Sequence, residues 1–94
     1  MISWDDPKNK INQQKHGLSF ESASLVFEDP LHVTRLERIE GHEQRYQTIG
    51  QVGGLVLILV AHTWTELDRG EEYIRIISAR RATKTEKAIY EQNE

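Results

Sequence analysis

The stretch IRIISARRATKTEKAIY (Ile74–Tyr90) passes from a strand pattern to a helix pattern within a few residues. Its first half is rich in β-branched residues, which favour strands. Thr83 and Glu86 then have the spacing of a capping box, which predicts that a helix begins at this point. The same stretch holds three arginines and two lysines, although the whole chain is acidic, with a formal charge of −3. The positive charge therefore marks a local surface and not a basic protein.

The composition predicts one small globular domain that spans residues 1–94. The chain is 37% hydrophobic and 29% charged, which suffices for a modest core in 94 residues. It has no cysteine, so disulfides and thiolate metal sites are excluded. The longest apolar run, Leu55–Ala61, is too short to span a membrane, and the first residues lack the apolar segment of a signal peptide. We expect a cytoplasmic protein that does not contact a membrane.

Helix signals dominate the first third of the chain. A short strand pattern at residues 2–4 precedes DDP at 5–7, which is typical of a helix start, and Gly17 is typical of a helix end. A second helix is predicted from Ser19 to the DP pair at 29–30, because apolar residues recur at helical spacing between them. Two short helices are therefore expected before most of the sheet.

Strand signals dominate the middle of the chain. Four alternating or continuous apolar patterns are separated by turn segments, which predicts an antiparallel meander. These patterns cover residues 31–38, 44–52, 55–62 and 73–80. The continuous apolar run that starts at Leu55 predicts a central strand that is buried on both faces. The expected fold class is α+β, with an antiparallel β-sheet of about four strands, two N-terminal helices and one C-terminal helix.

The cations around the junction between the last strand and the last helix are candidates for a phosphate-binding site. Alternation along the strand places Arg80 and Arg81 on opposite faces, and it places Arg75 on the face of Arg81. Lys84 falls in the first turn of the predicted helix, where the helix dipole also favours anions. Arg45 begins a neighbouring strand and is a further candidate.

These residues also have a structural interpretation. The arginines can form a solvated strand edge that pairs with nearby glutamates, including Glu86. Glu86 itself is predicted to be a helix cap and not a general base, because the capping box explains it. The sequence contains no metal-ligand spacing, phosphate-cradling glycine loop or nucleophile elbow. The expected site therefore contains no metal.

Proton transfer is the least determined part of the expected chemistry. Histidine has an ordinary pKa near neutrality, so His62 is a candidate for this role. Antiparallel pairing of residues 55–62 with residues 73–80 would place His62 away from Arg80, which argues against it. Tyrosines, including Tyr90, are further candidates. The residues alone leave open which group moves a proton.

Two motifs, one near each end of the chain, carry a family resemblance. The first is WDDPKNKINQQKHGLSFESASLVFEDP at residues 4–30, and the second is IRIISARRATKTEKAIYE at residues 74–91. Together they resemble the BrnT family of toxins from bacterial type II toxin-antitoxin systems, with Ser22 at a position where glutamate is common in that family. The resemblance spans nearly the whole chain, and the segment 31–73 contributes least to it.

The resemblance implies a RelE-like fold and a metal-independent endoribonuclease, without cofactors, that cleaves RNA and inhibits translation and growth. It implies a BrnA-type antitoxin partner with a ribbon-helix-helix domain, a higher hetero-oligomer with that antitoxin, and contact with operator DNA only through the complex. RelE-like nucleases use the 2′-hydroxyl of the RNA as nucleophile, so the protein orients the RNA and stabilises charge. The resemblance puts forward Arg80, Arg81, His62 and Tyr90 as catalytic residues, and Arg45, Arg75, Lys84, Lys15 and His16 as RNA-binding residues.

Two other functions fit the same residues. The chain can be a non-catalytic binding module that recognises the antitoxin or RNA through its basic surface, which explains the cations without a general base. It can also be a degenerate toxin that is kept for operon regulation. Growth arrest on expression without the partner distinguishes an active toxin from both alternatives.

Overall fold

The computed structural model, which describes residues 1–54 and 56–92, contains a five-stranded sheet and three α-helices within those residues. In chain order the elements are β1 (Ile2–Trp4), α1 (Asp6–His16), α2 (Phe20–Ala23), the 3-10 helix η1 (Ser24–Glu28), β2 (Val33–Glu40), β3 (Glu43–Val52), β4 (Val56–Glu66), β5 (Glu72–Arg81) and α3 (Lys84–Glu91). This order confirms the α+β class. The predicted strand start at Leu55 lies outside the described residues.

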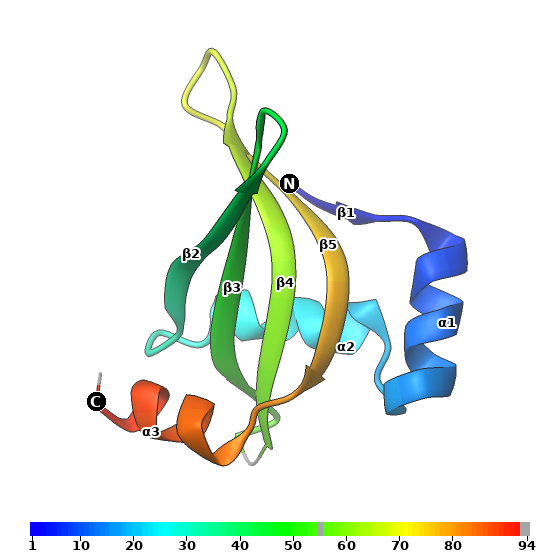
Figure 1. Cartoon of the computed structure of the whole chain (residues 1–94), viewed down its shortest axis with the longest axis vertical. Coiled ribbons are helices and arrows are strands. Elements are labelled where there is room, and N and C mark those ends of the chain that lie inside the picture. The colour runs from blue at the N-terminus through cyan, green and yellow to red at the C-terminus, as the bar shows by residue number, and fades with distance from the viewer. Residues whose placement is uncertain (55, 93–94) are drawn as a thin grey trace.

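The sheet has the strand order β1-β5-β4-β3-β2 (Figure 1). Strands β2 to β5 form the expected antiparallel meander, and the apolar strand β4 lies at its centre. β1 pairs in parallel with β5, with Ile2 opposite Ile74 and Trp4 opposite Ile76. The sheet is therefore mixed and has five strands: the short strand at residues 2–4 was predicted, but its parallel pairing with the sheet was not. Parallel pairing needs a long connection, and here most of the chain lies between the two strands.

The helix boundaries follow the capping signals of the sequence. The Asp5 side chain accepts a hydrogen bond from the Lys8 N–H at 3.2 Å, and Gly17, with a φ of 67°, ends α1 in the left-handed conformation. The Ser19 side chain caps α2 by accepting from the Ser22 N–H. The second predicted helix consists of one α-helical turn that continues as η1.

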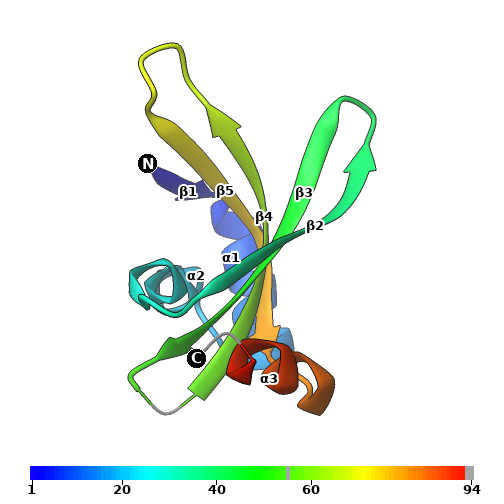
Figure 2. The same cartoon turned by 90° about the vertical axis from the view of Figure 1, so that its left-hand side faces the viewer.

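Helices pack on both faces of the twisted sheet (Figures 1 and 2). The larger core cluster lies on the side of α2 and η1, which we call the helix face, and α3 closes a smaller cluster on the opposite face. β3 approaches η1 so closely that a Cβ on Gly50 would lie 2.9 Å from the Val26 carbonyl oxygen. The buried members of the larger cluster are Phe20, Ala23, Val26, Ile58, Val60, Ile76 and Ala79, and those of the smaller cluster are Ile49, Leu59, Ala82 and Tyr90.

A β-bulge in β5 changes which side chains share a face. Ala61 of β4 lies opposite Ser78, but the next residue, His62, lies opposite Ile76, so Ile77 is an extra residue. Ile76 and Ala79 consequently both point into the core on the helix face, although they are three residues apart. The expected alternation, which placed Arg75 on the face of Arg81, is therefore wrong: beyond the bulge, the face of Arg75 continues with Arg80.

The side chain of Asn12 holds β5 just beyond this bulge. β1 pairs with β5 only as far as Ile76, so beyond that residue the outer edge of β5 has no strand neighbour among the residues that the structure describes. Asn12 is 5% exposed, its Oδ1 accepts from the Ala79 N–H at 3.1 Å, and its Nδ2 donates to the Ala79 carbonyl at 2.9 Å. Nδ2 also donates to the Leu18 carbonyl at 2.9 Å. One amide side chain thus replaces a strand and also ties α1 to the following loop.

Replacement of Asn12 tests this role. Asn12→Ala leaves the Ala79 N–H and carbonyl groups buried without their partner, and an unsatisfied buried group costs about 1 to 3 kcal/mol. We expect the free energy of unfolding to fall by about 2 to 4 kcal/mol, measured by urea denaturation. Gln14→Ala, at an exposed position of the same helix, is the control and is expected to have a small effect. Equal stabilities of the two variants would show that the Asn12 amide does not hold β5.

Candidate active site

The sheet face on the side of α3 carries arginines from three strands. Directly opposed residues of an antiparallel ladder share a face. One row across the sheet places Arg38 opposite Arg45, Arg45 opposite Thr63, and Thr63 opposite Arg75. A second row begins with Arg35 opposite Gln47, and a third ends with Leu59 opposite Arg80. We call this side the arginine face; its arginines are Arg35, Arg38, Arg45, Arg75 and Arg80.

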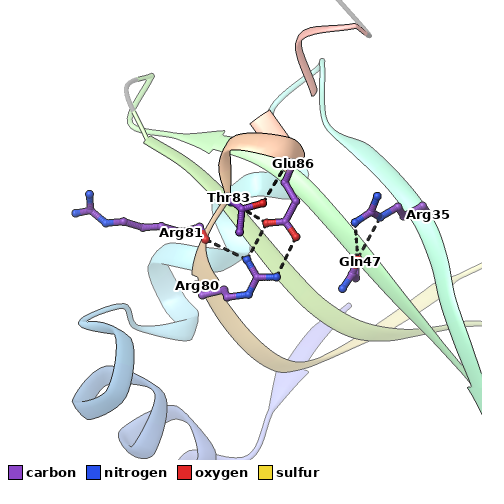
Figure 3. Close-up of polar contacts among 6 residues, drawn as sticks. All are labelled: Arg35, Gln47, Arg80, Arg81, Thr83 and Glu86. Carbon is purple, nitrogen blue, oxygen red and sulfur yellow. Dashed lines mark hydrogen bonds and ion pairs between the residues drawn. The ribbon is translucent and has the colours of Figure 1, made fainter. Parts of the chain in front are cut away.

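The guanidinium of Arg80 is held by the carboxylate of Glu86 on α3 (Figure 3). Nη1 donates to Oε1 at 2.7 Å and Nη2 donates to Oε2 at 2.9 Å. Nη1 also donates to the Arg81 carbonyl at 3.2 Å. Nε–H and the second Nη2–H have no partner among the described residues, and the side chain is 37% exposed. These two donors form an edge that matches two oxygens of a phosphate group.

Glu86 serves both the helix and the arginine. Its Oε1 accepts from the Thr83 N–H at 2.8 Å, and its own N–H donates to the Thr83 hydroxyl at 3.3 Å, which confirms the predicted capping box. The hydrogen bonds from Arg80 lower the pKa of Glu86 to about 2, against the opposing effect of burial, and the same contact raises the pKa of Arg80. Glu86 is thus an anion near neutral pH and a poor general base, as the sequence indicated.

The remaining cations of the arginine face differ in how far their charge is offset. Arg45 lies 3.3 Å from both Glu40 and Glu43, and its buried Nε makes no hydrogen bond with good geometry to any described residue. Arg35 donates from Nε and Nη2 to Gln47 Oε1, at 3.1 and 2.9 Å, so its charge is not neutralised by this contact (Figure 3). Arg75 is exposed and has no ion pair among the described residues. Arg35 and Arg75 therefore offer the less compensated charge to a ligand.

Other residues predicted for the site lie elsewhere. Arg81 points away from Arg80 (Figure 3) and lies with His16 and Ser22 around a hollow of about 240 Å³ on the helix face. Lys15 is exposed in the last turn of α1. Lys84 is exposed in the first turn of α3, on the same helix as Glu86. The structure thus places Lys84 on the helix that holds Arg80 through Glu86, and it places the side chains of Arg81, Lys15 and His16 elsewhere.

His62 lies in the core and is 1% exposed. Its Nδ1 lies 2.9 Å from the Thr63 carbonyl, which requires a proton on Nδ1, so Nε2 accepts from the Thr48 hydroxyl at 2.7 Å. Its ring stacks on Tyr46 and contacts the edge of Phe27. Burial lowers its pKa, and the tautomer is neutral. The pairing argument from the sequence is confirmed, because His62 lies opposite Ile76 and not near Arg80.

Tyr90 anchors α3 to the rest of the fold. It is 1% exposed, and its hydroxyl donates to Asp29 Oδ2 at 2.6 Å. The same oxygen of Asp29 accepts from the Gln51 N–H at 2.8 Å, so one carboxylate joins α3, β3 and the end of η1. Burial tends to raise the pKa of Asp29, but the hydrogen bonds from Tyr90 and two backbone N–H groups lower it overall. In this arrangement the Tyr90 hydroxyl does not open onto the arginine face.

Arg35 and Arg38 were not among the residues predicted for the site. Counting back from the turn at EGH pairs Glu40 with Glu43 and Arg38 with Arg45, so the hairpin register alone carries the signal for Arg38. Arg35 joins the face only through a second bulge, between Leu36 and Arg38, and a bulge of one residue leaves no clear mark in the sequence.

Two kinds of feature are absent from the described residues. Within residues 1–54 and 56–92, no group of three histidine, aspartate or glutamate side chains could hold a metal ion. None of the helices in the same residues is long and apolar enough to cross a membrane.

The architecture is a RelE-like α+β fold, in which an open sheet face bearing arginines meets a C-terminal helix. The family model described as "Ribonuclease toxin, BrnT, of type II toxin-antitoxin system" matches residues 4–86, so the chain belongs to the BrnT family of ribonuclease toxins. It is similar to the crystal structure of the Brucella abortus ribonuclease toxin, BrnT, at 32% sequence identity and a TM-score of 0.61. That match covers 89% of this chain and 100% of the other. No curated protein sequence matches this chain.

The pKa of Glu86 predicts a pH dependence of stability. The unfolded chain binds a proton at Glu86 below about pH 4.5, whereas the folded chain does so only near pH 2. The stabilisation from this group is therefore complete above about pH 4.5 and is lost as the pH falls toward 2. We expect Glu86→Gln to be less stable than the wild type at pH 7 and to lose less stability between pH 5 and 3, measured by urea denaturation.

Glu91→Gln is the matched control, because Glu91 is an exposed glutamate on the same helix without an ion pair among the described residues. It is expected to keep the wild-type stability at pH 7. The coupling between Arg80 and Glu86 is disproved if Glu86→Gln has the same pH dependence as the wild type.

Proposed function

We propose that this chain is the toxin of a type II pair and acts as a metal-independent endoribonuclease, cleaving RNA on the arginine face in the cytoplasm and so inhibiting translation and growth. The observation that carries the proposal is the geometry of Arg80. Glu86 and the Arg81 carbonyl hold one end of its guanidinium, and the Nε/Nη2 edge stays free for a phosphate. Membership of the BrnT ribonuclease toxins supplies the reaction class.

The proposed reaction is an internal transesterification of RNA. The 2′-oxygen attacks the adjacent phosphorus and the bond from phosphorus to the 5′-oxygen breaks, which leaves a 2′,3′-cyclic phosphate and a 5′-hydroxyl. The 2′-hydroxyl loses a proton and the departing 5′-oxygen gains one. The strands and α3 present no histidine to the arginine face within the described residues, so we assign both proton transfers to solvent. Arg80 stabilises the charge that develops on the phosphorane.

The other cations of this face are proposed to position the RNA. Arg75, Arg45 and Lys84 keep the RNA-binding role that the sequence predicted. Arg35 joins them because it lies on the same face and has no ion pair within residues 1–54 and 56–92. Strand rise is about 3.3 Å per residue, and four steps separate the Arg75 row from Arg80 once the bulge is allowed for, a span of roughly 13 Å. This span suits two phosphates of one strand of RNA that are separated by one intervening phosphate.

The predicted catalytic roles of Arg81, His62 and Tyr90, and the predicted RNA-binding roles of Lys15 and His16, remain open to experiment. Arg81 faces the opposite side of the sheet, and His62 and Tyr90 are buried and hydrogen-bonded. RNA bound at Arg80 would reach them only after a rearrangement of the core. Our proposal therefore places the chemistry at Arg80 without them.

The proposed partner is a BrnA-type antitoxin with a ribbon-helix-helix domain. A type II toxin is neutralised by a protein, and the family description names a toxin-antitoxin system. We further propose a higher hetero-oligomer in which the antitoxin alone contacts operator DNA. The acidic charge of the chain, −3, agrees with a toxin that does not bind duplex DNA by itself.

A comparison of two adjacent arginines tests the site. We expect Arg80→Ala to lower the rate of RNA cleavage about 100- to 1,000-fold, the effect of removing one donor to a transition-state anion. Arg81→Ala should leave cleavage and growth arrest near wild-type levels, because its side chain lies on the other face. Induced expression of each variant, followed by growth and RNA integrity together, gives both measurements.

Two further observations make this comparison decisive. Thermal melting shows whether Arg80→Ala is folded, and Arg75→Ala, at an exposed position of the same face, tests the face without disturbing the Glu86 pair. It is expected to weaken RNA binding and to reduce the salt dependence of that binding. If the Arg80→Ala variant is folded and still arrests growth, Arg80 is not the centre of the active site. If the wild-type protein is folded but does not arrest growth, the result favours the hypothesis of a non-catalytic binding module or that of a degenerate toxin.

Removal of divalent metals tests the proposed mechanism. The described residues hold no cluster of three metal-binding side chains, and Arg80 is proposed to stabilise the charge that a metal otherwise stabilises. We expect cleavage by the purified protein to continue at an unchanged rate in excess EDTA. Loss of cleavage in EDTA, with recovery when Mg²⁺ is added, would contradict a metal-independent reaction.

A further inference from the structure

The two long hairpins separate at the end of the sheet that is remote from α3 (Figure 2). Residues of both hairpins line a cleft there. β3 begins at Glu43 and β4 continues to Glu66, but their ladder ends at the pair of Arg45 with Thr63. Beyond that pair lies a hollow of about 730 Å³. The residues that line it from the two sides include Ile39, His42, Glu43 and Gln44 from the β2–β3 hairpin and Trp64 and Glu66 from β4.

Large apolar side chains are exposed at this cleft. Ile39 is 61% exposed and Trp64 is 39% exposed, and both line the hollow. Leu36, on the adjoining part of β2, is 51% exposed. β2 is also an edge strand, so its outer backbone groups have no strand partner within the described residues. Exposed apolar side chains that are grouped beside an open strand edge mark an interaction surface.

The charge around the cleft is strongly negative. Residues 37–45 and 66–72, which form the ends of the two hairpins, contain seven carboxylates and three arginines, a formal charge of −4. The whole chain has a charge of −3, so the remaining residues carry +1. Glu43 and Glu66 line the cleft itself. This surface repels RNA phosphate and attracts a cationic polypeptide.

We propose that this cleft is the docking site for a segment of the antitoxin that carries a large apolar side chain flanked by lysine or arginine residues. The inference rests on the toxin-antitoxin pairing proposed above. It adds which surface of this chain binds the antitoxin and what kind of antitoxin segment that surface accepts. The apolar side chain covers Ile39 and Trp64, and the cations meet the carboxylates of the hairpin ends. The separated edges of β3 and β4 offer backbone groups to an extended segment.

A second copy of this chain fits the cleft less well. A two-fold dimer places the same patch on both sides of its interface, and here it would bring two surfaces of charge −4 together. RNA fits less well for the same electrostatic reason. The antitoxin segment is the occupant whose charge complements the cleft.

Binding of the purified chain to the antitoxin encoded beside its gene, measured by titration calorimetry, tests the proposal. Covering one large aliphatic side chain contributes about 1.5 to 3 kcal/mol, so we expect Ile39→Lys to weaken binding about 10- to 100-fold. Ile11→Lys is the matched control, because Ile11 is 60% exposed on α1, and its binding should stay within about twofold of the wild type. Glu66→Lys should also weaken binding and reduce its dependence on salt.

Three outcomes would overturn the proposal. Ile39→Lys and Ile11→Lys can bind equally well, which removes the cleft from the interface. Arg75→Ala can weaken antitoxin binding while Ile39→Lys does not, which places the antitoxin on the arginine face. The free chain can form a dimer that Ile39→Lys abolishes, which assigns the cleft to a second copy. RNA cleavage is measured separately. If the chain binds the antitoxin through the cleft but does not cleave RNA, the proposed ribonuclease activity is refuted and the docking proposal is not.

Discussion

The arginine face depends on Asn12 and on the bulge at Ile77, because together they fix which side chains of β5 point to each face of the sheet. The bulge shifts the strand by one residue, and the Asn12 amide takes both backbone hydrogen bonds of Ala79 immediately afterwards. Without the extra residue, Arg80 would point toward the helix face, and Arg81 would point toward α3. The bulge therefore determines which of two adjacent arginines meets the C-terminal helix, because a strand alternates with a period of two, and the Asn12 amide holds the strand in this register.

Helix α3 is held at both ends by groups that also organise the site. At its start, Glu86 completes the capping box and orients Arg80, so helix formation and arginine positioning share one carboxylate. Near its end, Tyr90 donates to Asp29, which also binds β3. The guanidinium is thus fixed before any ligand binds, and this saves the entropy that a flexible arginine would lose on binding.

Local signals predicted much of this fold, and the failures have a common cause. Caps at Asp5, Ser19 and Thr83 and the glycine stop at Gly17 are short-range interactions, so the helices could be located from the sequence. The meander followed from turn residues in the same way. The bulges could not be predicted, because no distinctive residues mark them. Each extra residue nevertheless moves the side chains that follow it to the opposite face of the sheet. Site assignments that relied on alternation inherited this error, whereas Arg80 was found because it lies at the helix junction.

The same hairpin connects the arginine face to the acidic cleft. Arg45 lies on the arginine face, but its partners, Glu40 and Glu43, belong to the hairpin end, and Glu43 lines the cleft. A cation that binds Glu43 from the cleft side competes with Arg45 for that carboxylate, so the charge available on the arginine face depends on what occupies the cleft. The charges of the arginine face and of the acidic cleft are thus energetically linked, because Glu43 pairs with Arg45 and also lines the cleft.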